Sequence, residues 1–334
     1  MTSKMLQEIT SQNEDLIKVR ELYKTAAPVI FNQLKAKERV FLMGTGASLQ
    51  ACLAALPAFL IHSGLDVQVV EARDTTKIRT IRKEDIVILI SQSGNSLETR
   101  DAIDQLKKQG VEIIGITNNS DSYLWEKSDM SYPILAEDET GAATKSFSCT
   151  TYILYHIATV RNIVLFNELE KIIDDNKKTL EVMPKLAKEY AEKLTGHNVM
   201  YITGIDDAAC SPVQSAIVIK EKTRIHAVGL SITEFRHGTV EVVDNGLPVV
   251  IIAIGKEAFN KAVLHKKYIQ SLNGDVIIVS DDINADIVFY NSLSEEFGHI
   301  NAQVFFQYFS EAVAVARGYD VDQFRYLTKT VDKY

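Results

Sequence analysis

The chain has 334 residues, 46% of them apolar and 24% charged, a composition that supports a large core and disfavours disorder. At about 150 residues per domain, this length suggests two domains. The 36 Lys and Arg residues are outnumbered by 44 Asp and Glu, and the resulting net charge of −8 argues against a nucleic-acid-binding face.

Membrane insertion and secretion are also disfavoured. The chain lacks the run of about 18 apolar residues that a membrane helix needs, and its first residues contain no signal-peptide core. Cys52, Cys149 and Cys210 are odd in number and far apart, so neither a disulfide framework nor a zinc site is predicted. We expect a cytoplasmic protein.

Short apolar runs alternate with helix-length stretches, and the pattern occurs twice. Continuous apolar runs are typical of strands buried on both faces, and strand–helix alternation predicts a parallel sheet. The sequence therefore predicts an α/β fold with two tandem doubly wound parallel-sheet domains. The expected strands are residues 40–43, 67–70, 86–90 and 111–116, then 199–202, 248–252, 276–279 and 287–290.

The predicted organisation has five parts. Residues 1–35 form a helical segment, 36–166 the first sheet domain, 167–194 a helical connector, 195–318 the second sheet domain and 319–334 a C-terminal tail. The helical segment follows from the near-helical spacing of Leu6, Ile9, Leu16, Val19 and Leu22.

A hydroxyl-rich turn follows the buried strand at 86–90. It reads Ser-Gln-Ser-Gly-Asn-Ser over residues 91–96, and a helix begins at about Leu97. The carboxyl ends of parallel strands bind ligands, and helix N-termini attract anions. An ordinary helix cap accounts for one serine but not for three within six residues. We therefore predict a metal-free phosphate site, with Ser91, Gln92, Ser93 and Ser96 as its donors.

A second turn, residues 44–48, also lies between a predicted strand and a helix. Leu49 stands where a dinucleotide-binding GxGxxG motif needs its third glycine, and no Gly-Lys-Ser/Thr phosphate loop is present. A nucleotide cofactor is thus disfavoured, no other cofactor is predicted, and Ser48 is interpreted as a further donor to the same anion. The corresponding turn of the second half, residues 253–258, has no hydroxyl and contains Glu257, so we expect one phosphate site per chain.

The Ser-Gln-Ser-Gly-x-Ser motif resembles that of the sugar-isomerase (SIS) domain. Two such domains in tandem resemble the isomerase half of glucosamine-6-phosphate synthase, the fructosamine-6-phosphate deglycases and the amino-sugar-phosphate deaminases. The synthase's glutaminase domain is not expected here. Four further segments carry the resemblance: residues 5–12, 139–145, 220–238 and 320–331.

The resemblance implies roles for three residues. Glu221 would shuttle a proton between C1 and C2 of an open-chain sugar phosphate, His237 would assist ring opening, and Lys329 would form an imine with a ketose. A carboxylate, a histidine that titrates near neutrality and a nucleophilic amine suit these tasks. Outside these motifs, each residue would be interpreted as an ordinary solvated side chain or turn residue.

The sequence departs from the synthase on the segment that bears Glu221. Gln214 and Val218 replace a glutamate and a lysine, and Thr239 replaces a proline after His237-Gly238. These changes argue against synthesis of glucosamine 6-phosphate and leave the nitrogen substituent undefined. His226 is flanked by two apolar residues and is predicted to be a buried core histidine.

Two classes of function remain open. One is an enzyme: an isomerase, deaminase or deglycase acting on an amino- or amine-linked sugar 6-phosphate. The other is a sugar-phosphate sensor, which would not need Glu221, His237 and Lys329 together. The resemblance also implies a homodimer with shared active sites, in which His237 reaches the partner's Glu221. The apolar residues of 223–238 were expected to form that contact.

Overall fold

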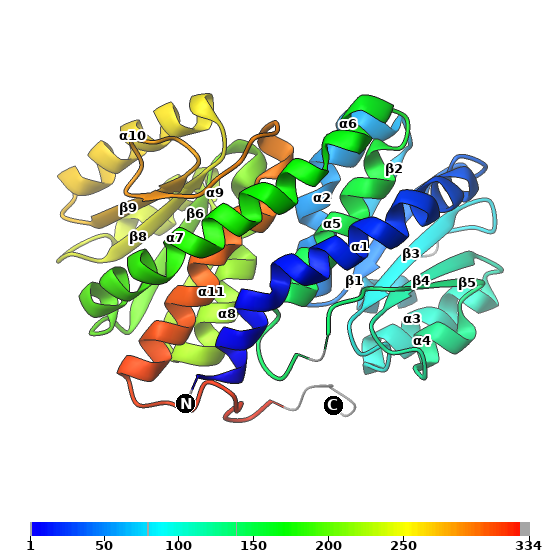
Figure 1. Cartoon of the computed structure of the whole chain (residues 1–334), viewed down its shortest axis with the longest axis horizontal. Helices are drawn as coiled ribbons and strands as arrows, with labels where there is room; N and C mark the ends of the chain where they lie inside the picture. The colour runs from blue at the N-terminus through cyan, green and yellow to red at the C-terminus, as the bar shows by residue number, and fades with distance from the viewer. Residues whose placement is uncertain (1, 79, 138, 328–334) are drawn as a thin grey trace. The chain divides into compact units, whose positions relative to one another are not determined.

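The computed structural model describes residues 2–78, 80–137 and 139–327. The chain divides into two compact units, each built around one sheet (Figure 1). The first-sheet unit comprises Glu14–Glu139, Lys145–Leu169 and Arg325–Tyr334, and the second-sheet unit comprises Met1–Asn13, Thr140–Thr144 and Glu170–Phe324. The N-terminal helix α1 (Lys4–Leu34) contributes residues to both.

The first sheet is parallel, with the strand order β2-β1-β3-β4-β5 among the described residues. Its strands are β1 (Val40–Gly44), β2 (Val67–Glu71), β3 (Ile86–Ser91), β4 (Glu112–Thr117) and β5 (Met130–Pro133). Its helices are α2 (Ala47–Ala58), α3 (Leu97–Lys108), α4 (Tyr123–Lys127), α5 (Lys145–Thr159) and α6 (Ile163–Glu168).

The second sheet is also parallel, in the order β10-β9-β8-β6-β7 over the same described part of the chain. Its strands are β6 (Val199–Gly204), β7 (His226–Ser231), β8 (Pro248–Ala253), β9 (Asp275–Ser280) and β10 (Ile287–Val288). Its helices are α7 (Glu170–Leu194), α8 (Ser211–Thr223), α9 (Ile232–Arg236), α10 (Lys256–Ser271) and α11 (His299–Ala316).

Strand β8 shows why the second sheet needs cover on both faces. Val250 and Ile252 pack into one apolar cluster together with α7, α8 and α11, whereas Val249 and Ile251 pack into another with α9 and α10. Successive side chains of a strand point to opposite faces, so a continuous apolar strand is stable only between two helical layers. The fold is therefore α/β with two five-stranded parallel sheets, as the strand–helix alternation predicted.

The segment 223–238 corrects two expectations. It is not a loose apolar excursion, because it contains the edge strand β7 and the helix α9. Ile225, Ala227 and Ile232 are at most 7% exposed and pack inside their own unit, so they are not free to form a subunit contact. His226, predicted to be buried, is exposed because it begins an edge strand.

In both sheets the strand order reverses beside the central strand. The chain passes from β1 to β2 on one side and then to β3 on the other, so the reversal lies between β1 and β3. In the second sheet it lies between β6 and β8. Open α/β sheets bind ligands at the carboxyl end of such a reversal point. The turn after β3 therefore occupies the position where a ligand site is expected.

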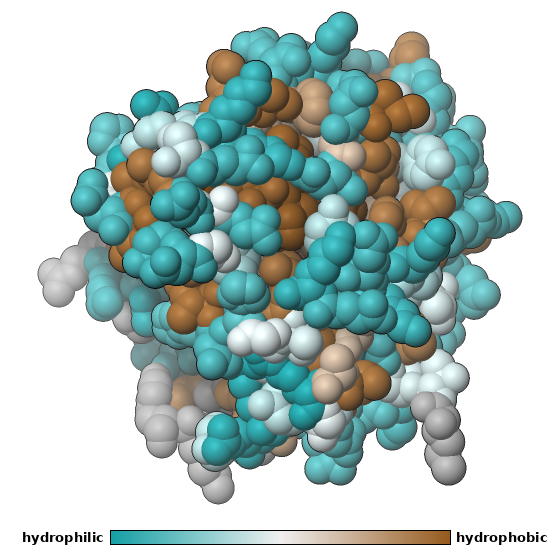
Figure 2. Space-filling view, turned by 90° about the vertical axis from the view of Figure 1, so that its left-hand side faces the viewer, coloured by the Kyte–Doolittle hydropathy of each residue, from teal (hydrophilic) through white to brown (hydrophobic). Residues whose placement is uncertain are grey.

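One face of the molecule is mostly hydrophilic. Figure 2 shows a face on which hydrophilic side chains cover most of the area, with apolar side chains visible between them. In the described parts of the chain, every helix is too short or too polar to cross a lipid bilayer.

Candidate functional site

The Ser-rich turn is preorganised by its own backbone. Ser91 Oγ accepts a hydrogen bond from the Gly94 N–H at 3.1 Å, and Ser93 Oγ accepts one from the Asn95 N–H at 3.3 Å. Each of these two hydroxyls uses its oxygen within the turn, so its proton remains available to donate outward. Ser96 caps α3 by accepting from the Thr99 N–H. The turn thus presents hydroxyl donors at a helix N-terminus.

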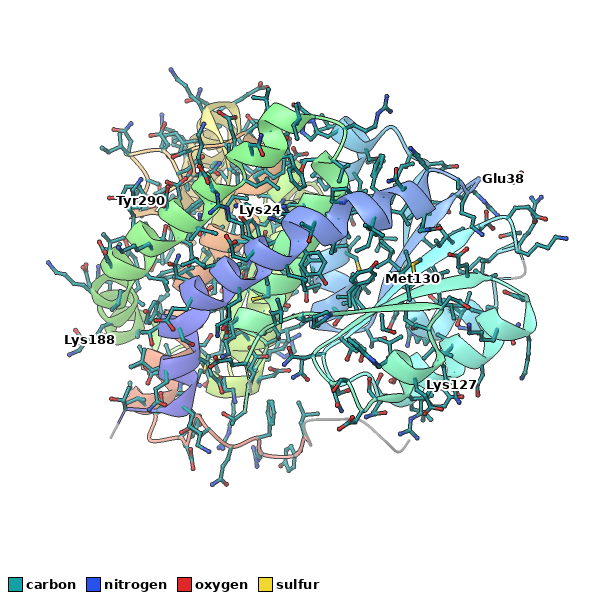
Figure 3. The ribbon with its side chains drawn as sticks, turned by 45° about the vertical axis from the view of Figure 1, so that its right-hand side comes forward. Lys24, Glu38, Lys127, Met130, Lys188 and Tyr290 are labelled. Carbon is teal, nitrogen blue, oxygen red and sulfur yellow. The ribbon has the colours of Figure 1, made fainter. Side chains whose placement is uncertain are left out.

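Contacts to the next turn along the sheet fix the loop. Gly94 has φ +66°, and a Cβ there would lie 2.2 Å from Ser122 Oγ, so only glycine fits. Asn95 Oδ1 accepts a hydrogen bond from the Tyr123 N–H at 2.9 Å, and the Gly94 carbonyl accepts one from the Leu124 N–H. Figure 3 labels Lys127 on α4, the helix that supplies these N–H donors.

Ser48 lies in the first turn of α2, directly after β1. Gly46, with φ +57°, begins this helix without a side-chain cap, and the neighbouring Thr45 Oγ1 is buried with no hydrogen-bond partner among the described residues. Because β1 and β3 are adjacent and parallel, the turns after them share one edge of the sheet. The geometry is therefore compatible with Ser48 and residues 91–96 serving one anion.

The equivalent place in the second sheet is acidic. The N–H of Gly255, at the start of α10, donates to Asp281 Oδ1 at 2.8 Å, and the Glu295 side chain lies against the Gly255 Cα. Partial burial, then the nearby Asp207 and Glu257, raise the pKa of Glu295. Carboxylates of the protein thus occupy the place that serines occupy in the first sheet.

Sequence segments that are far apart meet around α8 in the second-sheet unit. Thr140 donates to Glu8 Oε1 through its N–H at 2.6 Å and its hydroxyl at 2.9 Å. Gln214 Nε2, on α8, donates to the Ala143 carbonyl at 3.1 Å. Segments 5–12 and 139–145 and the helix of Glu221 were singled out separately in the sequence, and here they form one contact network. Glu8 and Gln214 are both at most 5% exposed.

The C-terminal tail joins this network. Asp322 accepts hydrogen bonds from the N–H groups of Lys4 and Met5, each at 3.0 Å, and so caps the N-terminus of α1. A carboxylate at that position accepts hydrogen bonds from free N–H groups and interacts favourably with the positive end of the helix dipole. Figure 1 shows the tail passing beside the start of α1.

The structure separates two of the predicted residues. Glu221 is half-buried in the last turn of α8, which leads into the beginning of β7, whereas exposed His237 follows α9 beyond the end of β7. At about 3.3 Å per residue, the six residues of β7 span roughly 20 Å, so the two side chains of one chain lie toward opposite edges of the sheet. Lys329 lies outside the described residues.

Two contact residues were missed from the sequence. Asp322 was included only as part of a tail motif, and Lys222 was not singled out, although it stands four residues after the buried Val218 on the same face of α8. The signal available in the sequence was the position of this lysine, at a helical spacing from an apolar residue that predicts burial. Within residues 2–78, 80–137 and 139–327, no group of three His, Cys, Asp or Glu side chains is placed to hold a metal ion.

Residues 33–161 match the SIS domain family. They contain the whole first sheet, Ser48 and the turn 91–96. This part of the chain is therefore similar to a SIS domain, and the second sheet repeats its parallel architecture.

Curated relatives extend the similarity beyond this domain. A glutamine–fructose-6-phosphate aminotransferase (isomerizing) of Pyrobaculum aerophilum is 28% identical over 348 residues, covering 98% of this chain and 57% of the relative. The corresponding protein of Sulfurisphaera tokodaii is 28% identical over 305 residues, covering 90% and 51%. The chain thus spans about half the length of these relatives.

Solved structures show the same fold over nearly the entire chain. The C-terminal domain of glucosamine-fructose-6-phosphate aminotransferase from Francisella tularensis has a TM-score of 0.86 at 20% identity, covering 97% of this chain and 98% of its own. Glucosamine-6-phosphate deaminase from Thermotoga maritima has a TM-score of 0.83 at 23% identity, covering 99% and 100%.

Proposed function

We propose that this protein is a phosphosugar isomerase-type enzyme that acts on an amino- or amine-linked sugar 6-phosphate, as a deaminase or deglycase. The observation that carries the proposal is the turn 91–96: oriented hydroxyls at a helix N-terminus, beside the reversal point of a sheet that matches the SIS domain. Similarity to aminotransferases and to a deaminase acting on sugar 6-phosphates supports the substrate class.

Each proposed residue has one chemical task. Ser48, Ser91, Gln92, Ser93 and Ser96 hold the phosphate. Glu221 takes the proton from one of the two adjacent carbons, C1 or C2, and returns it to the other. His237 donates a proton to the ring oxygen as the ring C–O bond breaks and the anomeric hydroxyl loses its proton. Lys329 attacks the C2 carbonyl of a ketose, and the imine forms with loss of water.

The surroundings of Glu221 favour release over synthesis. Gln214 and Val218, each 1% exposed, are uncharged at the two α8 positions where the synthase has a carboxylate and an ammonium. Loss of the charge at both positions, on the helix that bears Glu221, changes the stabilisation of a charged nitrogen group. We therefore propose that the nitrogen group is released from the sugar and not added to it.

The test is release of ammonia or amine from a panel of 6-phosphorylated amino sugars and fructosamines, with the unphosphorylated sugars beside them. Turnover of a phosphorylated member, lost in Glu221→Gln and retained in Glu192→Gln, an exposed glutamate of α7, supports the proposal. Tight binding of sugar phosphates with no turnover on any member contradicts it and favours a sugar-phosphate sensor.

We further propose a homodimer with shared sites, in which His237 acts beside the partner subunit's Glu221. The support is the separation of the two residues along β7. An apolar surface in the first-sheet unit also suits a subunit contact: Leu60, Ile61, Ile163 and Val164 are 59–66% exposed, on segments joined by the Arg161–Ser63 hydrogen bond.

Complementation tests the shared site. Inactive Glu221→Ala and His237→Ala chains are mixed under exchange, and random pairing should restore about a quarter of wild-type activity, because half of the dimers are mixed and one of their two sites is intact. His226→Ala, at an exposed histidine of β7, is the matched control and should stay active alone. No recovery in verified mixed dimers would place the whole site within one chain.

A further inference from the structure

The last turn of α8 holds the C-terminal tail at several points. Arg317 Nη1 donates to the Thr223 carbonyl at 3.0 Å, and the Arg224 guanidinium lies 3.8 Å from the centre of the Tyr319 ring. Lys222 Nζ donates to the Val321 carbonyl at 2.9 Å. Arg224 and Lys222 therefore contact the tail itself, and Thr223 contacts Arg317 at the end of α11, just before the tail.

Lys222 is a charged side chain buried at this contact. Its side chain is 3% exposed, and its Nζ also lies 4.3 Å from the centre of the Phe324 ring, a cation–π geometry. Burial of an ammonium is unfavourable unless polar partners replace water. The tail carbonyl and ring supply such partners, so the attraction acts directly between α8 and the tail.

Gly141 completes the binding site for the ammonium. A Cβ at this position would lie 2.5 Å from Lys222 Nζ and 3.0 Å from its Cε, and 3.8 Å from the Val321 carbonyl oxygen. Glycine is thus required for the lysine to pass between the 140–144 segment and the tail. Three segments of the chain meet at this one nitrogen.

We propose that Lys222 is a positioning residue that anchors the tail to the helix turn bearing Glu221. The inference rests on the proposed function, because the anchor would hold the tail at a fixed position relative to Glu221, the proposed proton shuttle. Lys329 follows Phe324 by five residues in the sequence. The proposal predicts that loss of the Lys222 anchor slows the chemical step and leaves phosphate binding intact.

Two variants remove the anchor from opposite sides. Lys222→Met keeps the length of the side chain and removes the charge. Gly141→Ala displaces the ammonium, which is the far end of a flexible side chain, so the fold is retained if the first variant proves unstable. Gly196→Ala is the matched control, because a Cβ at Gly196 meets nothing within 4 Å.

Three measurements decide the proposal. On the sugar-free protein, hydrogen exchange of residues 319–327 should become roughly tenfold faster in both variants and stay unchanged in the control. With sugar phosphate, kcat should fall at least about tenfold while the Kd stays within about twofold. The double variant should be no worse than the more damaging single variant, since both remove one interaction.

The outcomes separate the anchor from the function. Unchanged tail exchange in Lys222→Met and Gly141→Ala overturns the anchor. Faster exchange with unchanged kcat overturns the positioning role, and a parallel loss of sugar-phosphate affinity assigns Lys222 to binding instead. A wild-type protein that turns over no sugar phosphate overturns the proposed function, and the exchange data then decide the anchor alone.

Discussion

Removal of the Ser91 and Ser93 hydroxyls should abolish most sugar-phosphate affinity. Ser91 and Ser93 each accept a backbone N–H within the turn and keep a proton to donate. A hydrogen bond to a charged group contributes about 1.5–3 kcal/mol, so the double change Ser91→Ala and Ser93→Ala should cost about 3–6 kcal/mol. That loss corresponds to a Kd between roughly a hundredfold and ten-thousandfold weaker.

Titration calorimetry with fructose 6-phosphate and glucosamine 6-phosphate, with and without a chelator, measures this loss. Ser310→Ala is the control: Ser310 is fully buried and bonds only to its own helix, at the Phe306 carbonyl, so its loss should leave the Kd unchanged. An unchanged Kd in the double variant, at wild-type melting temperature, would refute the phosphate site. Binding abolished by the chelator would refute its metal-free character.

Three further predictions concern the turn, the duplication and acid stability. Gly94→Ala should lower sugar-phosphate affinity at least about tenfold, because a Cβ would meet Ser122 and φ is +66°; wild-type affinity would show that the turn need not be fixed. Calorimetry should give one sugar phosphate per chain, and a stoichiometry of two would contradict this. Burial lowers the pKa of His156 to about 3, whereas an unfolded histidine titrates near 6.5, so the unfolded chain takes up the proton first as the pH falls. Between about pH 8 and pH 5, the free energy of unfolding of the wild type should therefore fall by about 2 kcal/mol more than that of His156→Phe. Urea denaturation measures both. Equal losses would show that His156 is protonated in the folded protein.

The sheets were predictable where strands are buried on both faces. The apolar runs that became β1, β3, β8 and β9 have no polar alternation to obscure them. The edge strands β5 and β7 were missed, because each has only partial cover and the pattern of its residues is mixed. The error on β7 led directly to the wrong burial of His226 and the wrong surface role for the residues around it.

The candidate site was predictable only where it is contiguous in sequence. The hydrogen bonds of Ser91 and Ser93 span two or three residues, so the sequence pattern predicts this part of the geometry. The contacts of Glu8 with Thr140 and of Lys222 with Val321 join residues 132 and 99 positions apart. Local periodicity carries no information on such pairs. The resemblance indicated the segments, but only the fold shows that they meet around α8.

Electrostatics explains how one architecture, present twice, can serve two tasks. An incoming phosphate at the second reversal point would meet Asp281, already bonded to the Gly255 N–H, and the Glu295 carboxylate beside it. Two like unit charges about 4 Å apart repel by roughly 4 kcal/mol at an effective dielectric constant of about 20, which offsets one or two good hydrogen bonds. The first reversal point has hydroxyls in that place. Asp281 and Glu295 thus disfavour a phosphate at the second reversal point, so the second unit contributes to a sugar-phosphate reaction through other groups. The network around α8, at the opposite edge, is where the motif residues gather.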